Sequence, residues 1–116
     1  MRVRLKKKRT VVLFMRSHAR ARVSLREWLS RVKYAEWDIP QDIVGTFGSN
    51  NIDILGSYKG KNSNRVVFDI AGNNYRILCY YQFGTKYIRL YITWIGTHAE
   101  YDKLCDANEQ YTICKY

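Results

Sequence analysis

The alternation of apolar and polar residues predicts three antiparallel strands in the second half of the chain. Three runs rich in β-branched and aromatic residues are separated by two short turns, and the first turn, residues 71–74, contains Gly and Asn, which tolerate a positive φ. The runs are residues 65–70, 75–83 and 86–95, and Ile88, Leu90, Ile92 and Trp94 are expected on one buried face of the third. Consecutive hairpins of this kind predict an antiparallel meander.

The first half of the chain favours helices. An apolar stripe at helical spacing is formed by Leu25, Trp28, Leu29 and Val32. Ser24 and Glu27 match a capping box at the start of this helix, although residues 19–23 could extend it backwards. A second, short helix is expected after Pro40, which is tolerated in a first helical turn.

Shorter segments complete the pattern. Residues 2–5 alternate and indicate a strand, whereas residues 8–17 are ambiguous because their β-branched side chains favour a strand locally. Residues 56–64 are predicted to form a polar loop, and the tail, residues 105–116, is expected to be frayed or lightly packed. Helices followed by strands predict a single α+β domain over residues 1–116, with the helices packed on one face of the sheet.

Positive charge is concentrated in the first third of the chain. The net charge is +10, and residues 1–34 carry twelve Lys or Arg against one acid. A one-sided positive field favours a polyanion such as nucleic acid, although a solvated charged face is the simpler interpretation. The residues expected to bind RNA or a ribosome are Arg2, Arg4, Lys6, Lys7, Lys8, Arg9, Arg20 and Arg22.

Cysteine spacing and the short apolar runs restrict the compartment. The three cysteines show no CxxC spacing, which argues against a disulfide framework and a zinc site and indicates a reducing, cytoplasmic compartment. The apolar run at residues 11–15 is too short for the core of a signal peptide. No stretch approaches the roughly eighteen apolar residues of a membrane span. We therefore expect a cytoplasmic protein without a membrane segment.

Groups suited to phosphodiester chemistry are expected where the third strand ends. Thr97 and Glu100 match a capping box that would begin a helical turn with His98 at its first position. Tyr101 and Asp102 follow three and four residues later, so they would lie on the same side of that turn as His98. Because imidazole titrates near neutrality, His98 could act as an acid or a base, and a purely structural histidine is the alternative.

Arginines on neighbouring strands could bind phosphate, because a guanidinium group donates two parallel hydrogen bonds. Arg65 and Arg76 lie at opposite ends of a predicted hairpin, with Arg65 expected opposite residue 79 or 80, and a solvated charge is the ordinary fate of such a residue. Asp69 and Glu100 do not form the carboxylate cluster of a metal-dependent nuclease. A nuclease built from these residues is expected to need no metal and no cofactor, and to use the ribose 2′-OH as its attacking group.

Four tyrosines and a second histidine are further candidates for contacts with nucleic acid. Tyr80, Tyr81, Tyr87 and Tyr91 lie on predicted strands and could stack on bases, although such residues more often fill half-buried sheet faces. His18 is expected in a loop without a functional role.

These motifs resemble those of the HigB toxins, which belong to the RelE-like superfamily of bacterial toxin–antitoxin systems. The resemblance covers about residues 1–105 and is most specific in the string Gly96-Thr97-His98-Ala99-Glu100-Tyr101-Asp102-Lys103. The other matching segments are residues 28–37, 39–43, 47–48, 65–70 and 72–76. Ala71 stands where a glycine is common in the family, and the tail matches nothing in it.

The resemblance implies a RelE-like fold, in which two N-terminal helices pack on a small curved antiparallel sheet. Residues 2–5 would be a strand of that sheet and residues 8–17 a helix. It also implies ribosome-dependent, metal-independent cleavage of mRNA and neutralisation by a HigA-like helix-turn-helix antitoxin, with a heterotetramer as one arrangement of the complex. Carried over residue by residue, the catalytic set would be Arg65, Arg76, His98, Tyr101 and Lys103.

Three functional alternatives stay open at this point. The chain could be an mRNA endonuclease, a non-catalytic basic module that binds RNA or DNA, or a degenerate toxin kept as an interaction partner. The presence of His98 and Tyr101 within one helical turn favours the enzyme, because a plain binding module would not need that pair. Which of the two would be the acid and which the base is not decided by the sequence.

Overall fold

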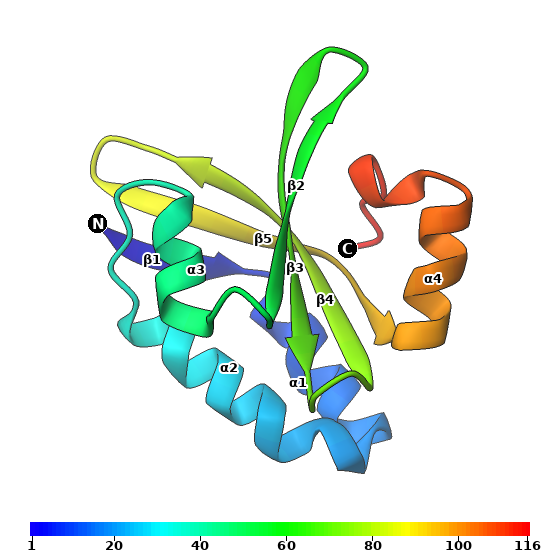
Figure 1. Cartoon of the computed structure of the whole chain (residues 1–116). Coiled ribbons are helices and arrows are strands. Elements are labelled where there is room, and N and C mark those ends of the chain that lie inside the picture. Colours follow the sequence, from blue (N-terminus) through cyan, green and yellow to red (C-terminus); the bar gives the residue numbers. More distant parts are fainter.

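A five-stranded sheet with helices on both faces forms the framework of the molecule (Figure 1). The computed structural model describes all 116 residues. The elements follow in the order β1 (Arg2–Lys6), α1 (Lys8–Ser17), α2 (Arg22–Tyr34), α3 (Gln41–Phe47), β2 (Ile52–Tyr58), β3 (Lys61–Ile70), β4 (Tyr75–Phe83), β5 (Tyr87–Thr97) and α4 (His98–Asp106), with 3₁₀ turns at Ala19–Ala21 and Glu109–Tyr111. The predicted α+β class is confirmed.

Strand order in the sheet is β1-β5-β4-β3-β2. Strands β2 to β5 form the predicted antiparallel meander, extended by one strand, and β1 joins the free edge of β5 in parallel. The expected polar loop at residues 56–64 is wrong, because β2 and β3 run through it as a hairpin. The hairpin turns at Lys59 and Gly60, which both have a positive φ, and its many polar residues concealed the strand pattern.

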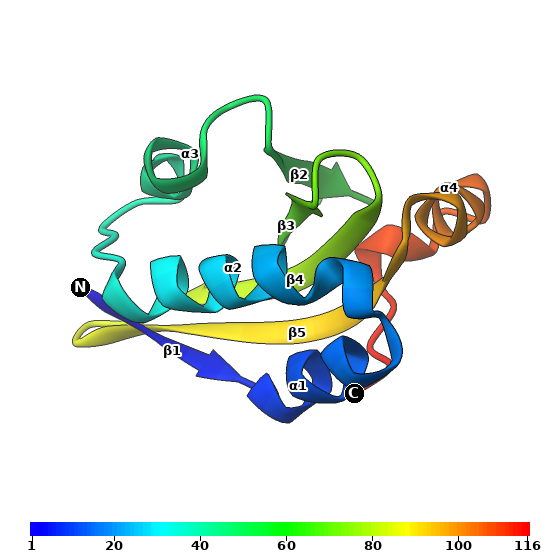
Figure 2. The same cartoon turned by 90° about the horizontal axis from the view of Figure 1, so that it is seen from below.

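Two hydrophobic clusters lie on opposite faces of the sheet. The larger cluster contains 19 buried residues and packs the sheet against α1, α2 and α3, so the two N-terminal helices are where the resemblance placed them (Figure 2). The smaller cluster packs α4 against the other face, a layer that the sequence did not predict. Its members are Leu55, Val67, Leu78, Trp94 and Leu104.

The expected position of Trp94 on the same face as Ile92 is wrong. Leu78 pairs with Trp94 while the next residue, Cys79, pairs with Ile92, so Thr93 is an extra residue in β5. Such a bulge shifts the register by one residue and turns the following side chains to the opposite face. Trp94 therefore belongs to the cluster under α4, and Ile92 belongs to the larger one.

Helix α1 and the start of α2 differ from what the local sequence predicts. Residues 8–17 are helical despite their β propensity, because Val11 is fully buried in the larger cluster. The predicted capping box at Ser24 is wrong. Helix α2 already begins at Arg22, after Ala21 has closed a 3₁₀ turn by donating to the carbonyl of His18 at 3.0 Å. No helix of the chain is both long enough and apolar enough to cross a membrane.

The tail is packed against the sheet, so the expectation of a frayed end is wrong. The amide of Lys115 donates to the carbonyl of Thr93 at 2.9 Å, and Gln110 is buried. The guanidinium of Arg65 donates to the carbonyl of Ile113 at 2.7 Å. Residues after α4 therefore continue the layer that α4 begins.

Candidate active site

The junction between β5 and α4 holds the histidine predicted to be functional. The predicted capping box is present: the amide of Glu100 donates to Thr97 Oγ1 at 3.2 Å, and the amide of Thr97 donates to Glu100 Oε1 at 2.8 Å. The amide of His98 donates to the carbonyl of Asn74 at 3.0 Å, which ties the first turn of α4 to the β3–β4 turn. The capping box at the end of β5 and the β3–β4 turn therefore fix the position of the His98 backbone.

Gly96 allows the close approach at this junction. A Cβ atom at this position would lie 2.6 Å from two ring atoms of Trp94 and 3.0 Å from Glu100 Oε1. The absence of a side chain therefore lets Trp94 pack under α4 while Glu100 completes the capping box.

Arg76 lies beside this junction, because β4 places it opposite Gly96. Its side chain is only 9% exposed, and its Nε is 3.1 Å from Asp69 Oδ1. Its Nη1 donates to the carbonyl of Tyr75 at 3.0 Å, and its Nη2 donates to Asn73 Oδ1. Burial raises the pKa of Asp69, while the positive charges of Arg76 and His98 act to lower it. Arg76 is thus a rigidly held cation at the edge of the site.

His98 is half-buried and faces Asp102 along the helix. Its Nε2 is 3.4 Å from Asp102 Oδ2, as expected of residues four apart on one helical face. Its Nδ1 is buried and has no hydrogen-bond partner. The Asp102 carboxylate is therefore close enough to form an ion pair with the ring whenever the ring carries a positive charge.

Tyr101 lies between the helix and the sheet. Its ring is 5.8 Å from that of Trp94, centroid to centroid. Burial raises the pKa of Tyr101 well above its ordinary value, with further contributions from Cys105 and Asp53, and Arg76 acts in the opposite direction. Burial therefore favours the protonated phenol, which can donate a hydrogen bond.

Not all five residues of the expected catalytic set come together. Arg76, His98 and Tyr101 surround the same junction. Lys103 is exposed, and five residues along a helix place it about 140° around the axis from His98. Arg65 pairs with Tyr80, as expected, but it lies four residues along β3 from Asp69, or about 13 Å at strand spacing. Its guanidinium is buried under the tail.

Sequence reasoning missed two neighbours of this junction. Asn73 accepts a hydrogen bond from Arg76, but its position in a Gly-Asn-Asn turn suggested only a backbone role. Asp53 raises the pKa of both Asp69 and Tyr101, so it lies close to both. It was overlooked because β2 was not predicted. No group of three or more His, Cys, Asp or Glu side chains is arranged to bind a metal ion.

The basic residues expected to bind RNA occupy two regions. Six lie on β1 and at the start of α1, and most of these are exposed. Arg4 is stacked over the ring of Tyr87, with its Cζ 3.7 Å from the ring centroid. Arg20 and Arg22 lie apart from them, at the turn between α1 and α2, where Arg22 Nε donates to the carbonyl of Met15 at 3.0 Å. His18 lies in the same turn, stacked on Phe14 with 3.7 Å between ring centroids.

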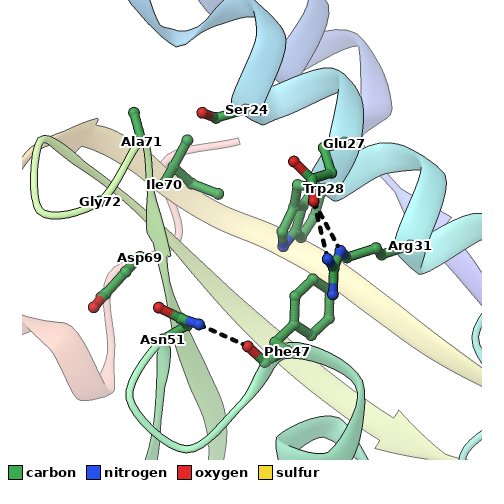
Figure 3. Close-up of a pocket in the computed structure, with 10 residues that line it drawn as sticks. All are labelled: Ser24, Glu27, Trp28, Arg31, Phe47, Asn51, Asp69, Ile70, Ala71 and Gly72. Atoms are coloured by element: carbon green, nitrogen blue, oxygen red, sulfur yellow. Dashed lines mark hydrogen bonds and ion pairs between the residues drawn. The ribbon is translucent and has the colours of Figure 1, made fainter.

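A polar cavity of about 210 Å³ lies next to Asp69, between α2 and the β3–β4 turn (Figure 3). Its wall carries Glu27, which is paired with Arg31 at 2.9 Å, and Trp28, whose buried Nε1 has no partner. None of the predicted catalytic residues lines it. The candidate active site is therefore the β5–α4 junction and not this cavity.

Two comparisons with known proteins identify the family of the chain. Residues 21–104 match the sequence model of a family described as "HigB_toxin, RelE-like toxic component of a toxin-antitoxin system". The chain is also 33% identical over 73 residues to a protein of Escherichia coli O6:H1 named "mRNA interferase HigB". That match covers 63% of this chain and 63% of the length of the relative. Strand β4, which carries Arg76, and the first two turns of α4, which carry His98 and Tyr101, fall within residues 21–104.

Proposed function

The chain belongs to the HigB family of RelE-like toxins, and on this premise we propose that it is an endoribonuclease that cleaves mRNA on the ribosome. The observation that carries the proposal is the meeting of Arg76, His98 and Tyr101 at the start of a capped helix. A buried cation, an imidazole and a neutral phenol supply charge stabilisation and proton transfer without further groups.

In the proposed reaction, the ribose 2′-OH attacks the adjacent phosphorus and the 5′-oxygen of the next nucleotide leaves. Because burial favours the protonated phenol of Tyr101, we assign the base to His98, which takes the proton from the 2′-OH. Asp102 then stabilises the resulting imidazolium, because its carboxylate is 3.4 Å from Nε2. The departing 5′-oxygen takes up a proton from water, so the products are a 2′,3′-cyclic phosphate and a free 5′-hydroxyl.

Charge that develops on the phosphoryl oxygens is stabilised by Arg76 and by a hydrogen bond from the phenol of Tyr101. Asp69 and Asn73 hold the guanidinium of Arg76 in place, so little reorganisation is needed when the charge appears. Lys103 is exposed and carries no ion pair, so it would contact the RNA backbone outside the reacting centre. Arg65 is given no part in the chemical step, because its side chain is buried under the tail.

The basic residues of β1 and α1 would hold ribosomal RNA, and a HigA-like antitoxin would neutralise the toxin. Changing Lys6, Lys7 and Lys8 to Glu is expected to weaken ribosome binding and reduce its salt dependence, because fewer counterions are released from phosphates. Production of the chain alone should arrest growth, and production of the antitoxin together with it should restore growth. Since ribosomes are its target, the proposed place of action is the cytoplasm.

The central experiment measures cleavage of a defined mRNA on purified ribosomes by primer extension. His98→Ala is expected to lower the rate about a hundred- to ten-thousand-fold, the usual range for a proton-transfer group. Arg76→Ala is expected to lower it about a hundred- to a thousand-fold, as for an oxyanion-hole donor. His18→Ala, which removes the other histidine, is the matched control and should cleave normally.

Two results would contradict the proposal. An mRNA with a 2′-deoxy sugar at the cut site should resist cleavage, so cutting at the normal rate would exclude 2′-OH attack. Full activity of both His98→Ala and Tyr101→Phe would place the site elsewhere. Tight ribosome binding by the wild-type chain without any cleavage would favour the non-catalytic RNA-binding alternative.

A further inference from the structure

Half of the second sheet face is left open by α4 and the tail. On this face β1 and β5 run side by side, so that Arg4 lies opposite Arg89 and Lys6 lies opposite Tyr91. Strand β4 continues the second of these rows, with Tyr80 opposite Tyr91. The open half therefore presents rows of basic and aromatic side chains across three adjacent strands.

A hollow of about 440 Å³ lies between this open half and the tail. Tyr80 and Tyr91 form one part of its wall, Cys114 and Tyr116 of the tail form another, and Lys7 lies at its rim. The rings of Tyr80 and Tyr91 are 6.2 Å apart and tilted by 43°. The size is within the range of small-ligand sites, roughly 300 to 1,000 Å³.

Arg65 adds a buried charge to this hollow. It is 7% exposed and lines the hollow, yet no carboxylate lies within ion-pair distance of it. Its Nη1 makes the only side-chain hydrogen bonds of the guanidinium, to Thr93 Oγ1 at 3.4 Å and to the carbonyls of Gln110 at 3.3 Å and Ile113 at 2.7 Å. A buried cation without a counter-charge is costly, and an electron-rich ligand in the hollow would offset that cost.

Arg4 and Arg89 form a second centre of uncompensated charge nearby. Their Cζ atoms lie 3.7 Å and 4.8 Å from the centroid of the same ring, that of Tyr87. Like charges directly opposite on neighbouring strands are destabilising, and no acid is paired with either arginine. A phosphate between the two guanidinium groups would remove the repulsion and accept hydrogen bonds from both.

We propose that the open half of the sheet binds a nucleotide of single-stranded RNA, with its base in the hollow beside Tyr80 and Tyr91 and its phosphate on Arg4 and Arg89. Base and phosphate would then occupy neighbouring rows of the sheet, which lie two residues, or about 7 Å, apart along a strand. Tyrosine faces beside basic side chains fit an unpaired base, because stacking needs an exposed π-face. Paired bases in a duplex cannot enter the hollow. The site is separate from His98 and requires no cleavage.

The test measures binding of a single-stranded oligoribonucleotide of about ten nucleotides, a length within the usual site size, that contains one 2-aminopurine. Fluorescence anisotropy of an end label gives the affinity, and quenching of 2-aminopurine reports stacking of a base. All variants carry His98→Ala, so that the RNA stays intact. Because the readout is binding, a failure of the proposed cleavage chemistry would leave this result unchanged.

Matched variants distinguish binding at the proposed site from attraction by the net charge of the protein. Tyr91→Leu and Arg89→Gln are expected to weaken binding about tenfold each, within the range for loss of one stacked base, and Tyr91→Leu should also abolish the quenching. Tyr34→Leu and Arg26→Gln remove an exposed tyrosine and an exposed arginine of α2 and should bind as the parent does. Tyr91→Phe keeps the ring and should retain the quenching, which separates stacking from a loss of folding.

Three outcomes would overturn the proposal. Equal losses in Arg89→Gln and Arg26→Gln would mean that only net charge matters. Quenching that persists in Tyr91→Leu would place the base elsewhere. Preferential binding of a duplex of the same length, or equally strong competition by polyglutamate, would show that the open half recognises a different polyanion.

Discussion

Thr97→Ala tests how the capping box controls the position of His98. The change removes the hydroxyl that accepts the amide of Glu100 at 3.2 Å and leaves the other bond of the box in place. Loss of such a cap costs about 1 kcal/mol, within a range of about 0.5 to 2. For a domain of this size, a loss of 1 kcal/mol lowers the Tm by about 4 °C. The substitution is therefore expected to be tolerated by the fold.

The rate of mRNA cleavage is expected to fall by a larger factor in Thr97→Ala than the small loss of folding free energy alone would cause. The box and the bond from the His98 amide to Asn74 hold the first turn of α4 on the sheet. A displacement of about 1 Å in a reacting group can cost about a hundredfold in rate. Partial release of the turn in Thr97→Ala is therefore expected to lower mRNA cleavage on ribosomes about tenfold.

Urea denaturation followed by circular dichroism, together with primer-extension cleavage assays, would check both expectations. Thr97→Ser keeps the accepting hydroxyl and should restore stability and cleavage together. Thr85→Ala, in the exposed β4–β5 turn, is the matched control and should change neither. A Thr97→Ala chain that loses about 1 kcal/mol but cleaves at the normal rate would refute the positioning role of the cap.

Three other substitutions probe neighbouring features. The hydrogen bond that the Thr97 amide donates holds the pKa of Glu100 below its ordinary value of 4.5. The contribution of the Glu100 carboxylate to stability is therefore present above pH 4.5 and is lost as the pH falls further. In Glu100→Gln, the decline of Tm between pH 5 and pH 3 should be flatter than in the parent chain. Gly96→Ala should cost about 1 to 3 kcal/mol in urea denaturation, because its Cβ would lie 2.6 Å from the Trp94 ring, and unchanged stability would contradict that packing. Arg65→Met should speed hydrogen exchange at the Lys115 amide while the Tm changes little, because it releases the tail and also removes an uncompensated buried charge; a tail that stays protected would show that it packs without Arg65.

Local sequence patterns correctly predicted those helices and strands whose structure depends mainly on their own residues. The β4–β5 hairpin follows from alternation, and the first turn of α4 follows from Thr97 and Glu100. The same patterns failed where contacts between residues far apart in the sequence determine the local structure. Val11 is helical because it is buried by tertiary packing, and Trp94 changes face because of a bulge that no propensity reveals. The strand β2 was concealed by its glycine and polar residues.

The candidate site was predicted only in part for the same reason. His98 and Tyr101 belong to one helical turn, so spacing alone placed them together. Arg76 joins them through strand pairing with Gly96, a residue that lies beyond the third strand predicted from the sequence. Arg65 is separated from them by its position on β3, four residues from Asp69, and its guanidinium is covered by a tail that carries no recognisable pattern. Residue type identified the candidates, and only the three-dimensional contacts distinguished them.

The pairing of β1 with β5 has a consequence for the order in which the chain folds. Arg2 pairs with Tyr87, so the sheet is completed by a contact between residues that are 85 positions apart in the sequence. Closing so large a loop is entropically costly, and a contact of this kind forms late and slowly. During synthesis, β1 and the two helices after it emerge first and must wait for β5, while α4 emerges later still. The reactive junction at the start of α4 therefore forms only after all five strands of the sheet have been synthesised.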